Sequence, residues 1–112
     1  MFRRNGLLQI LSLVQAEARM AQNEIGFTIC RAADGTLAAG PVREGTPTGV
    51  SFPISCPPKH RIEGLFHTHP GGSTALSSVD IQTALRTGAR NMCVEVPETG
   101  EMKCYKVARR RR

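Results

Sequence analysis

The chain has 112 residues, a hydrophobic content of 40% and a formal net charge of +6. This length predicts one domain with one modest core, and the lack of any apolar run of eighteen residues argues against a membrane-spanning helix. An apolar stretch over residues 7–14 follows two arginines, but Glu17 and Arg19 occupy the place of the small residues that a signal-peptide cleavage site needs. We therefore expect a cytoplasmic protein that does not associate with membranes.

The C-terminal end of the chain carries much of the positive charge. Residues 109–112 are four consecutive arginines, and without aromatic stacking residues beside them they indicate a solubilising tail rather than a nucleic-acid site. The sequence is thus divided into a single domain over residues 1–107 and a basic tail over residues 108–112.

The four cysteines, Cys30, Cys56, Cys93 and Cys104, form no Cys-x-x-Cys pair, which argues against a structural zinc site. In a reducing cytosol we expect them to be thiols. A bridge between Cys93 and Cys104 across a hairpin is the one exception that the spacing allows.

The first half of the chain changes from helical to strand periodicity. Asn5 can cap an amphipathic helix over residues 6–21. Residues 24–30 then read as a strand, Asp34 and Gly35 as a tight turn, and residues 36–39 as the partner strand.

The segment over residues 40–59 holds five of the seven prolines, so it predicts a loop with at best a short edge strand over residues 50–52. A strand over residues 62–69 follows.

The last part of the chain predicts a helix and a closing hairpin. Ser77 caps a helix over residues 78–87 that Gly88 ends. The residues expected on its buried side are Ile81, Ala84 and Leu85. Strands over residues 92–96 and 102–107 complete a mixed β-sheet flanked by helices, an α/β fold.

A pair of histidines lies at the end of the strand over residues 62–69. Side chains two apart in a strand point to the same face, so His67 and His69 can chelate one ion. Pro70 and the glycines after it allow a reversal, after which Asp80 lies in the first turn of the next helix and can return to the histidine pair. Two imidazoles and one carboxylate leave the fourth position of a zinc ion open for water.

These residues resemble the signature of the JAMM, or MPN-plus, zinc metalloproteases. The pattern is His67-x-His69, seven residues, Ser77, two residues and Asp80, and Glu24 follows the predicted first helix, where the family has a glutamate. The resemblance covers roughly residues 7–107 and is to the minimal archaeal or bacterial type, which includes desampylases and deubiquitinases. It implies the cytidine-deaminase-like MPN/JAMM fold.

The resemblance also implies a role for each site residue. One Zn²⁺ is held by His67, His69 and Asp80, Glu24 is the general base, and Ser77 stabilises the oxyanion. Two other glutamates compete with Glu24: Glu63 lies four residues before His67 on the metal-facing side but too far along the strand, and Glu44 lies in the predicted loop.

The activity implied is that of a zinc isopeptidase that cleaves after the C-terminal Gly-Gly of a ubiquitin-like or sulfur-carrier-like protein attached to lysine. We expect the Gly-Gly tail to lie along residues 46–56. A homodimer is left open. Two alternatives remain, a non-catalytic scaffold of the same fold and a nucleic-acid-associated accessory protein with the basic tail. A nucleic-acid deaminase fits poorly, since neither His-x-Glu nor Pro-Cys-x-x-Cys occurs.

Overall fold

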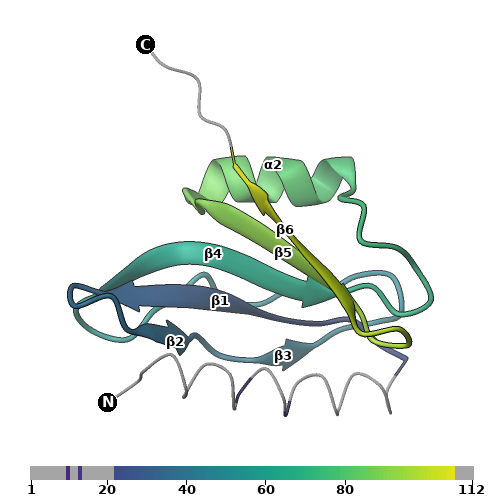
Figure 1. The fold of residues 1–112 in the computed structure, drawn as a ribbon, viewed down its shortest axis with the longest axis horizontal. Coiled ribbons are helices and arrows are strands. Elements are labelled where there is room, and N and C mark those ends of the chain that lie inside the picture. Colours follow the sequence, from purple (N-terminus) through teal and green to yellow (C-terminus); the bar gives the residue numbers. More distant parts are fainter. Residues whose placement is uncertain (1–9, 11–12, 14–21, 108–112) are drawn as a thin grey trace.

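A computed structural model describes residues 10, 13 and 22–107. The helix expected over residues 6–21 and the basic tail lie almost entirely outside this part of the chain. The described elements are the strands β1 (Ile25–Ala32), β2 (Leu37–Ala39), β3 (Arg43–Glu44), β4 (His60–Thr68), β5 (Asn91–Val96) and β6 (Glu101–Lys106) and the helix α2 (Ser78–Thr87), shown in Figure 1.

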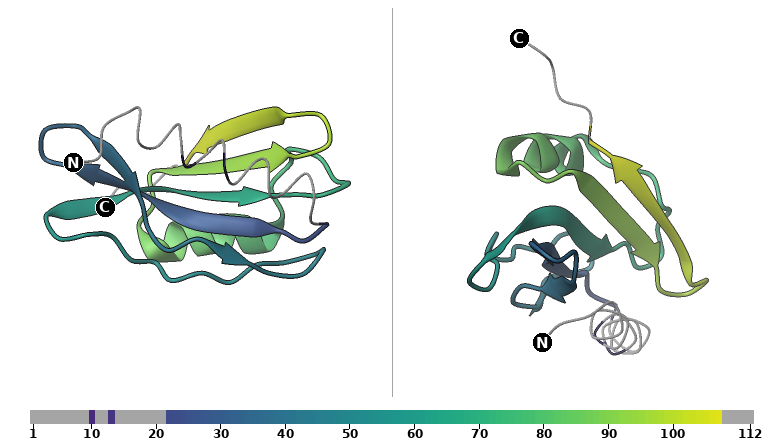
Figure 2. Two further views of the ribbon diagram at one scale, coloured as in Figure 1. Left: turned by 90° about the horizontal axis from the view of Figure 1, so that it is seen from below. Right: turned by 60° about the vertical axis from the view of Figure 1, so that its left-hand side comes forward.

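The strands form one mixed sheet in the order β2-β1-β4-β5-β6, and β3 also pairs with β1. All neighbouring strands are antiparallel except β4 and β5, which are parallel. A parallel pair needs a crossover connection, and α2 supplies it. Figure 2 shows α2 on one side of the sheet. The predicted α/β fold with a mixed sheet is confirmed.

The core is divided between the two faces of the sheet, because neighbouring side chains of β4 point in opposite directions. On one face Phe27 and Phe66 stack with ring centroids 5.0 Å apart. On the other face Leu65 packs with Ala84 of α2, together with Ala89 and Met92. The histidine pair therefore extends from a strand that is buried on both sides.

Helix α2 begins and ends at the residues that the sequence predicts. Ser77 and Asp80 form a reciprocal capping box, and Gly88 ends the helix in the left-handed conformation with φ of 82°. The prediction that Ile81 and Leu85 are buried is wrong, since they are 47% and 46% exposed. Only the small Ala84 is buried, so α2 contacts the sheet along a narrow stripe.

The proline-rich segment is mostly loop, as predicted, with two differences. Residues 43–44 pair with β1 as the short strand β3, and the hydrogen bonding continues past Glu44, where Gly45 N–H donates to the Glu24 carbonyl and Glu24 N–H to the Thr46 carbonyl. The edge strand expected over residues 50–52 does not form. Instead the segment is attached to β1 by a hydrogen bond of 3.1 Å from the Thr28 hydroxyl to the Pro53 carbonyl.

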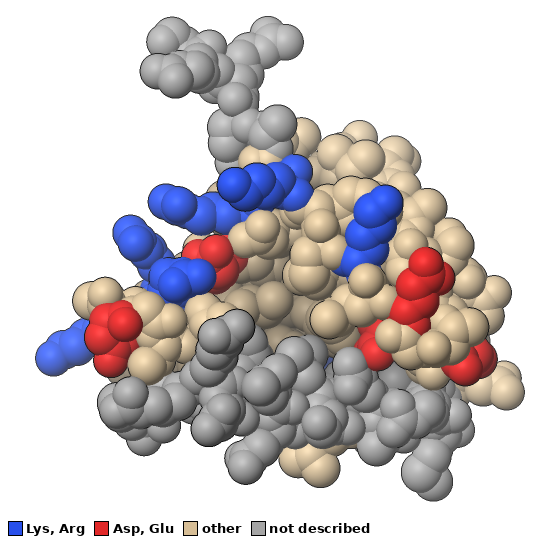
Figure 3. Space-filling model, viewed as in Figure 1, with Lys and Arg blue, Asp and Glu red and all other residues tan. Residues whose placement is uncertain are grey.

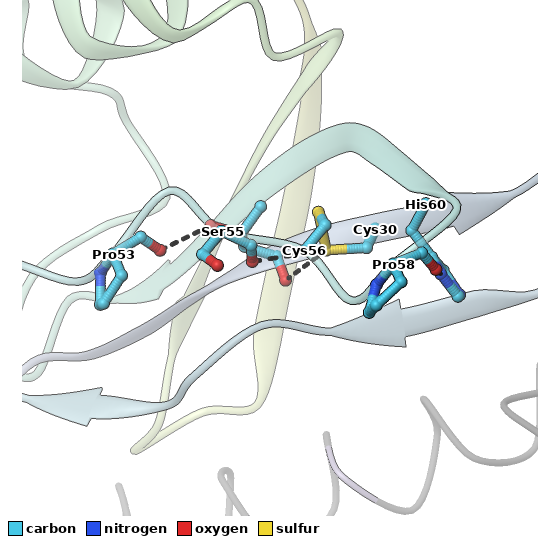
Figure 4. The surroundings of a disulfide bond; sticks show 7 residues. Cys30, Pro53, Ser55, Cys56, Pro58 and His60 are labelled. Atoms are coloured by element: carbon cyan, nitrogen blue, oxygen red, sulfur yellow. Dashed lines mark hydrogen bonds between the residues drawn. A yellow bond between two sulfur atoms is a disulfide. The ribbon is translucent and has the colours of Figure 1, made fainter.

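All four cysteines are paired, so the expectation of free thiols is wrong. Cys93 and Cys104 are direct partners in the β5–β6 register and form one disulfide. Cys30 and Cys56 form the other, which joins β1 to the proline-rich segment (Figure 4). The second bridge spans 26 positions and depends on how the loop returns to β1, which no sequence pattern reveals. Such bridges are uncommon in a reducing cytosol, and the cytoplasmic location stays a prediction.

No helix in the described part of the chain is long and apolar enough to cross a membrane.

Candidate metal centre

The two histidines direct their Nε2 atoms at one point. His67 and His69 follow one another with a single residue between them at the end of β4, and their Nε2 atoms are 2.9 Å apart. The backbone amide of His69 donates to the Glu95 carbonyl of β5 at 2.8 Å, which extends the parallel pairing past the end of β4. Pairing with β5 thus fixes the backbone of His69, so that both imidazoles project from the same face of the sheet.

The hydrogen bonding of His69 also selects its tautomer. Its Nδ1 lies 2.9 Å from the Ser73 carbonyl. A carbonyl only accepts hydrogen bonds, so Nδ1 carries the hydrogen. The lone pair of the ring is then on Nε2, the atom that faces His67.

Asp80 brings a carboxylate to the same point from the first turn of α2. Its Oδ1 is 3.3 Å from His67 Nε2, and its Oδ2 is 3.5 Å from His69 Nε2. Burial acts to raise the pKa of Asp80, but hydrogen bonds from His67 and Ser77 outweigh it and lower the pKa to about 2. This carboxylate is therefore an anion at neutral pH.

Glu24 completes the group from the residue just before β1. The donor atoms of Glu24, His67 and His69 all lie within 4.8 Å of one another, and Glu24 is only 8% exposed. Burial raises the pKa of its carboxyl above the ordinary value, and the nearby His67 partly offsets this. A raised pKa suits a carboxylate that accepts and returns a proton near neutral pH.

The distances fit a small divalent cation. Four ligands at about 2.0–2.1 Å in a tetrahedron place neighbouring donor atoms about 3.3 Å apart. The two Nε2 atoms are 2.9 Å apart, and the two oxygens of Asp80 lie 3.3 Å from His67 Nε2 and 3.5 Å from His69 Nε2, all near this value. The donor set of two imidazole nitrogens and one carboxylate is also one that zinc favours in open sites. These residues could therefore hold a divalent metal ion.

The five predicted site residues share one cavity of about 400 Å³. Ser77 is one of its lining residues, and its hydroxyl accepts the Asp80 N–H at 3.1 Å and so keeps its own hydrogen to donate. The remaining lining residues are Thr48, Gly49, Val50, Phe52, Leu65, Val79, Thr83 and Met92. The structure thus brings together His67, His69, Asp80, Glu24 and Ser77, while their separate roles stay predictions.

The two competing glutamates lie elsewhere. The register between β1 and β4 shifts at Ile29, so that Glu63 is passed over as a bulge. Glu63 consequently lines the groove beside Phe66 on the opposite face of the sheet, where Arg31 Nε contacts its carboxylate at 2.9 Å. The prediction that Glu63 faces the metal side is therefore wrong. Glu44 accepts a hydrogen bond from Asn23 at 2.8 Å and does not line the cavity.

Sequence reasoning missed two residues that shape the site. The ring of Phe52 approaches Gly26 so closely that a Cβ on this glycine would lie 2.6 Å from Phe52 Cε2. Thr68, between the histidines, is fully buried and accepts a hydrogen bond from the Ile25 N–H. The glycine after Glu24-Ile25 was a signal for a close approach, whereas nothing in the sequence identified the partner of Thr68.

The charged surface is uneven. On the face seen in Figure 3, most Lys and Arg side chains gather towards the end of the sheet where β5 begins and β6 ends. The histidine pair follows the opposite end of β4, where α2 also begins (Figure 1). The basic side chains of this face are thus mostly remote from the candidate metal centre.

Comparisons with known proteins agree with this fold. No family model matches the chain, and no curated protein gives a significant match. Among solved structures, a JAB1/MPN domain protein from Archaeoglobus fulgidus is similar with a TM-score of 0.57 and 22% sequence identity, over 86% of this chain and 82% of that one. With its mixed sheet and its crossover helix, the chain has the fold of a JAB1/MPN domain.

Proposed function

We propose that the chain is a zinc-dependent isopeptidase that hydrolyses the bond between the C-terminal Gly-Gly of a ubiquitin-like modifier and a lysine side chain. The observation that carries this proposal is the convergence of His67 Nε2, His69 Nε2 and the Asp80 carboxylate within 3.5 Å, with the Glu24 carboxylate beside them. A scaffold without catalytic function has no need for this set of donors in one cavity.

His67, His69 and Asp80 would hold the ion. Bound zinc supplies a Lewis acid that polarises a carbonyl and makes water more acidic. Three protein ligands leave a position open for these two tasks. The ionised Asp80 balances part of the charge of the ion, since its pKa is about 2.

The other two residues would act on protons and on developing charge. Glu24, whose burial raises its pKa, takes a proton from water and returns it to the departing lysine amine. The Ser77 hydroxyl, whose oxygen already accepts from Asp80 N–H, donates to the substrate carbonyl oxygen as negative charge develops on it. One such donor contributes on the order of 3 kcal/mol to transition-state stabilisation.

The shape of the cavity suits an extended tail without side chains. Thr48, Gly49, Val50 and Phe52 line the cavity beside the donors, and all four belong to the segment over residues 46–56 in which we expect the Gly-Gly tail. Because Gly49 has no side chain and Thr48 is polar, we expect this wall to favour a chain that hydrogen-bonds through its main chain.

The test is hydrolysis of a ubiquitin-like protein joined through its C-terminal glycine to a lysine. We expect cleavage by the zinc-loaded chain, none after removal of metal with a chelator, and recovery when zinc is restored. Glu24→Gln preserves the size of the side chain and should bind zinc normally yet lower kcat by at least about a hundredfold. Cleavage that persists both in Glu24→Gln and with chelator would refute the proposal.

A further inference from the structure

The loop that connects the two parts of the metal centre is attached to the β5–β6 hairpin. This loop, residues 70–77, runs from His69 to the cap of α2. Near its start, the Gly71 N–H donates to both carboxylate oxygens of Glu98 at 3.0 Å. Further along, the Thr74 carbonyl accepts a hydrogen bond of 2.7 Å from the Tyr105 hydroxyl. Both anchors come from the hairpin, Glu98 from its turn and Tyr105 from β6.

The two anchors flank the loop carbonyl that contacts the ring of His69. Ser73 lies between Gly71 and Thr74, and its carbonyl accepts the hydrogen from His69 Nδ1 at 2.9 Å. The orientation of this carbonyl is set by the peptide that joins Ser73 to Thr74. The Thr74 carbonyl, in the next peptide along, is held by Tyr105.

The two strands of the hairpin are cross-linked next to Tyr105. The residue before it, Cys104, is bonded to Cys93 of β5. Tyr105 lines a groove with Leu76 and Met92, and Lys103 Nζ lies 5.1 Å from the centroid of the Tyr105 ring. The hydroxyl therefore has a fixed point from which to hold the loop.

We propose that Tyr105 and Glu98 are positioning residues for the metal centre: they hold loop 70–77 so that the Ser73 carbonyl keeps the hydrogen of His69 on Nδ1 and its Nε2 lone pair towards the metal. This assignment rests on the proposed function, in that His69 is taken as a ligand. Hydrogen-bond partners of metal-binding histidines typically change metal affinity by about 10- to 100-fold when they are removed. Because Tyr105 acts through the loop rather than on the ring, we expect a smaller effect.

The first experiment measures zinc affinity by competition with a chromophoric chelator. Tyr105→Phe, which removes only the hydroxyl, should raise the zinc Kd by about threefold to tenfold. Glu98→Ala should act in the same direction, and Glu98→Gln, which keeps an acceptor for Gly71 N–H, should restore the affinity. Lys103→Ala is the matched control, because it changes the surroundings of the Tyr105 ring and leaves the hydroxyl.

The second experiment needs no metal. In the metal-free protein with ¹⁵N-labelled histidines, the ring ¹⁵N chemical shifts of His69 should show the Nδ1–H tautomer. Tyr105→Phe should lower the population of this tautomer. His60 is an internal control, since its Nδ1 also lies 2.9 Å from a carbonyl, that of Pro58 (Figure 4), and it stands at the start of β4, away from the histidine pair at the other end. Its ring signals should not change.

The outcomes separate this proposal from the proposed function. Unchanged zinc affinity together with unchanged His69 ring signals in Tyr105→Phe would overturn the positioning role, even if the variant were less stable. A wild-type chain that binds no zinc would refute the isopeptidase proposal alone. The tautomer of His69 in the metal-free chain would then decide whether the hairpin positions the ring.

Discussion

The hydroxyl of Thr68 accepts a hydrogen bond of 2.9 Å from the backbone N–H of Ile25. Thr68 stands between the two histidines, and Ile25 directly follows Glu24. One buried hydrogen bond therefore connects the strand that carries the histidines to the residue that we propose as the general base. The face of β4 that does not meet the metal thus has a part in assembling the site.

Replacing Thr68 with valine should affect both stability and catalysis. The change leaves the Ile25 N–H buried without this acceptor, which costs about 1–3 kcal/mol of unfolding free energy. It should also lower kcat more than it changes the zinc Kd, because Glu24 moves while the ligands stay. Urea denaturation and zinc competition measure the two effects.

Thr28→Val is a matched control for this variant. It also removes a hydroxyl from a fully buried threonine, but one that donates to Pro53 of the proline-rich segment. We expect lower stability with kcat per bound zinc retained. Equal losses of kcat in the two variants would show that Thr68 acts only through stability.

Asp80 and Ser77 allow the helix cap to be separated from the metal. Asp80→Asn keeps an oxygen that can accept from Ser77 N–H, so the helix should retain its start while zinc binding weakens strongly. Ser77→Ala removes the acceptor for Asp80 N–H and should lower the unfolding free energy by about 0.5–2 kcal/mol, with a far smaller loss of zinc binding than in Asp80→Asn. Metal content and the unfolding free energy are measured for both variants. If bound zinc fell in proportion to the lost unfolding free energy in both, the two roles would not be separable.

The Arg31–Glu63 pair should make stability depend on pH. The hydrogen bond from Arg31 holds the pKa of Glu63 below its usual value. A carboxyl with a lowered pKa in the folded state stabilises the fold above its unfolded pKa of about 4.3, and the contribution is lost as pH falls through the folded pKa. Glu63→Gln should therefore lose less stability than wild type between pH 7 and pH 3.

Urea denaturation at the two pH values measures this difference. Glu101→Gln, at the exposed start of β6, provides the comparison for a carboxylate outside the groove. If wild type and Glu63→Gln lost the same free energy between the two pH values, the ion pair would have no net effect on folding.

The Cys30–Cys56 bridge should stabilise the wall of the cavity. For a loop of 26 residues, chain entropy predicts that its loss lowers the unfolding free energy by about 3.5 kcal/mol. In the double variant Cys30→Ala, Cys56→Ser, we expect a higher KM, because residues 48–52 line the cavity, and an unchanged zinc Kd. Reduced zinc affinity in the folded variant would contradict this expectation.

Sequence periodicity predicted the centre of the site because short-range rules determine it. The two-residue period of a strand places His67 and His69 on one face. The capping box fixes Asp80 relative to Ser77 within one helical turn. The position of Glu24 came only from resemblance to a family, since it depends on the pairing of β1 with β4, 43 positions away at the Ile25–Thr68 bond.

The errors arose where the outcome depends on distant parts of the chain. A single bulge in β4 turned Glu63 to the other face, and the strand pattern cannot show a bulge in advance. Ile81 and Leu85 lie within one helical turn of Ala84, yet they border a groove that also contains Met92 and Tyr105, and both stay about half exposed. The pairing of Cys30 with Cys56 likewise depends on the path of a proline-rich loop.

One oxygen of the Asp80 carboxylate belongs both to the cap of α2 and to the candidate metal centre. Its Oδ2 accepts from the Ser77 N–H at 3.0 Å and lies 3.5 Å from His69 Nε2. A cation bound at this carboxylate would hold it in place beside the Ser77 N–H, so binding of the ion and formation of the first helical turn are thermodynamically linked. Amide exchange at Ser77 and Asp80 should accordingly slow as the site fills, which makes the helix start a built-in reporter of occupancy.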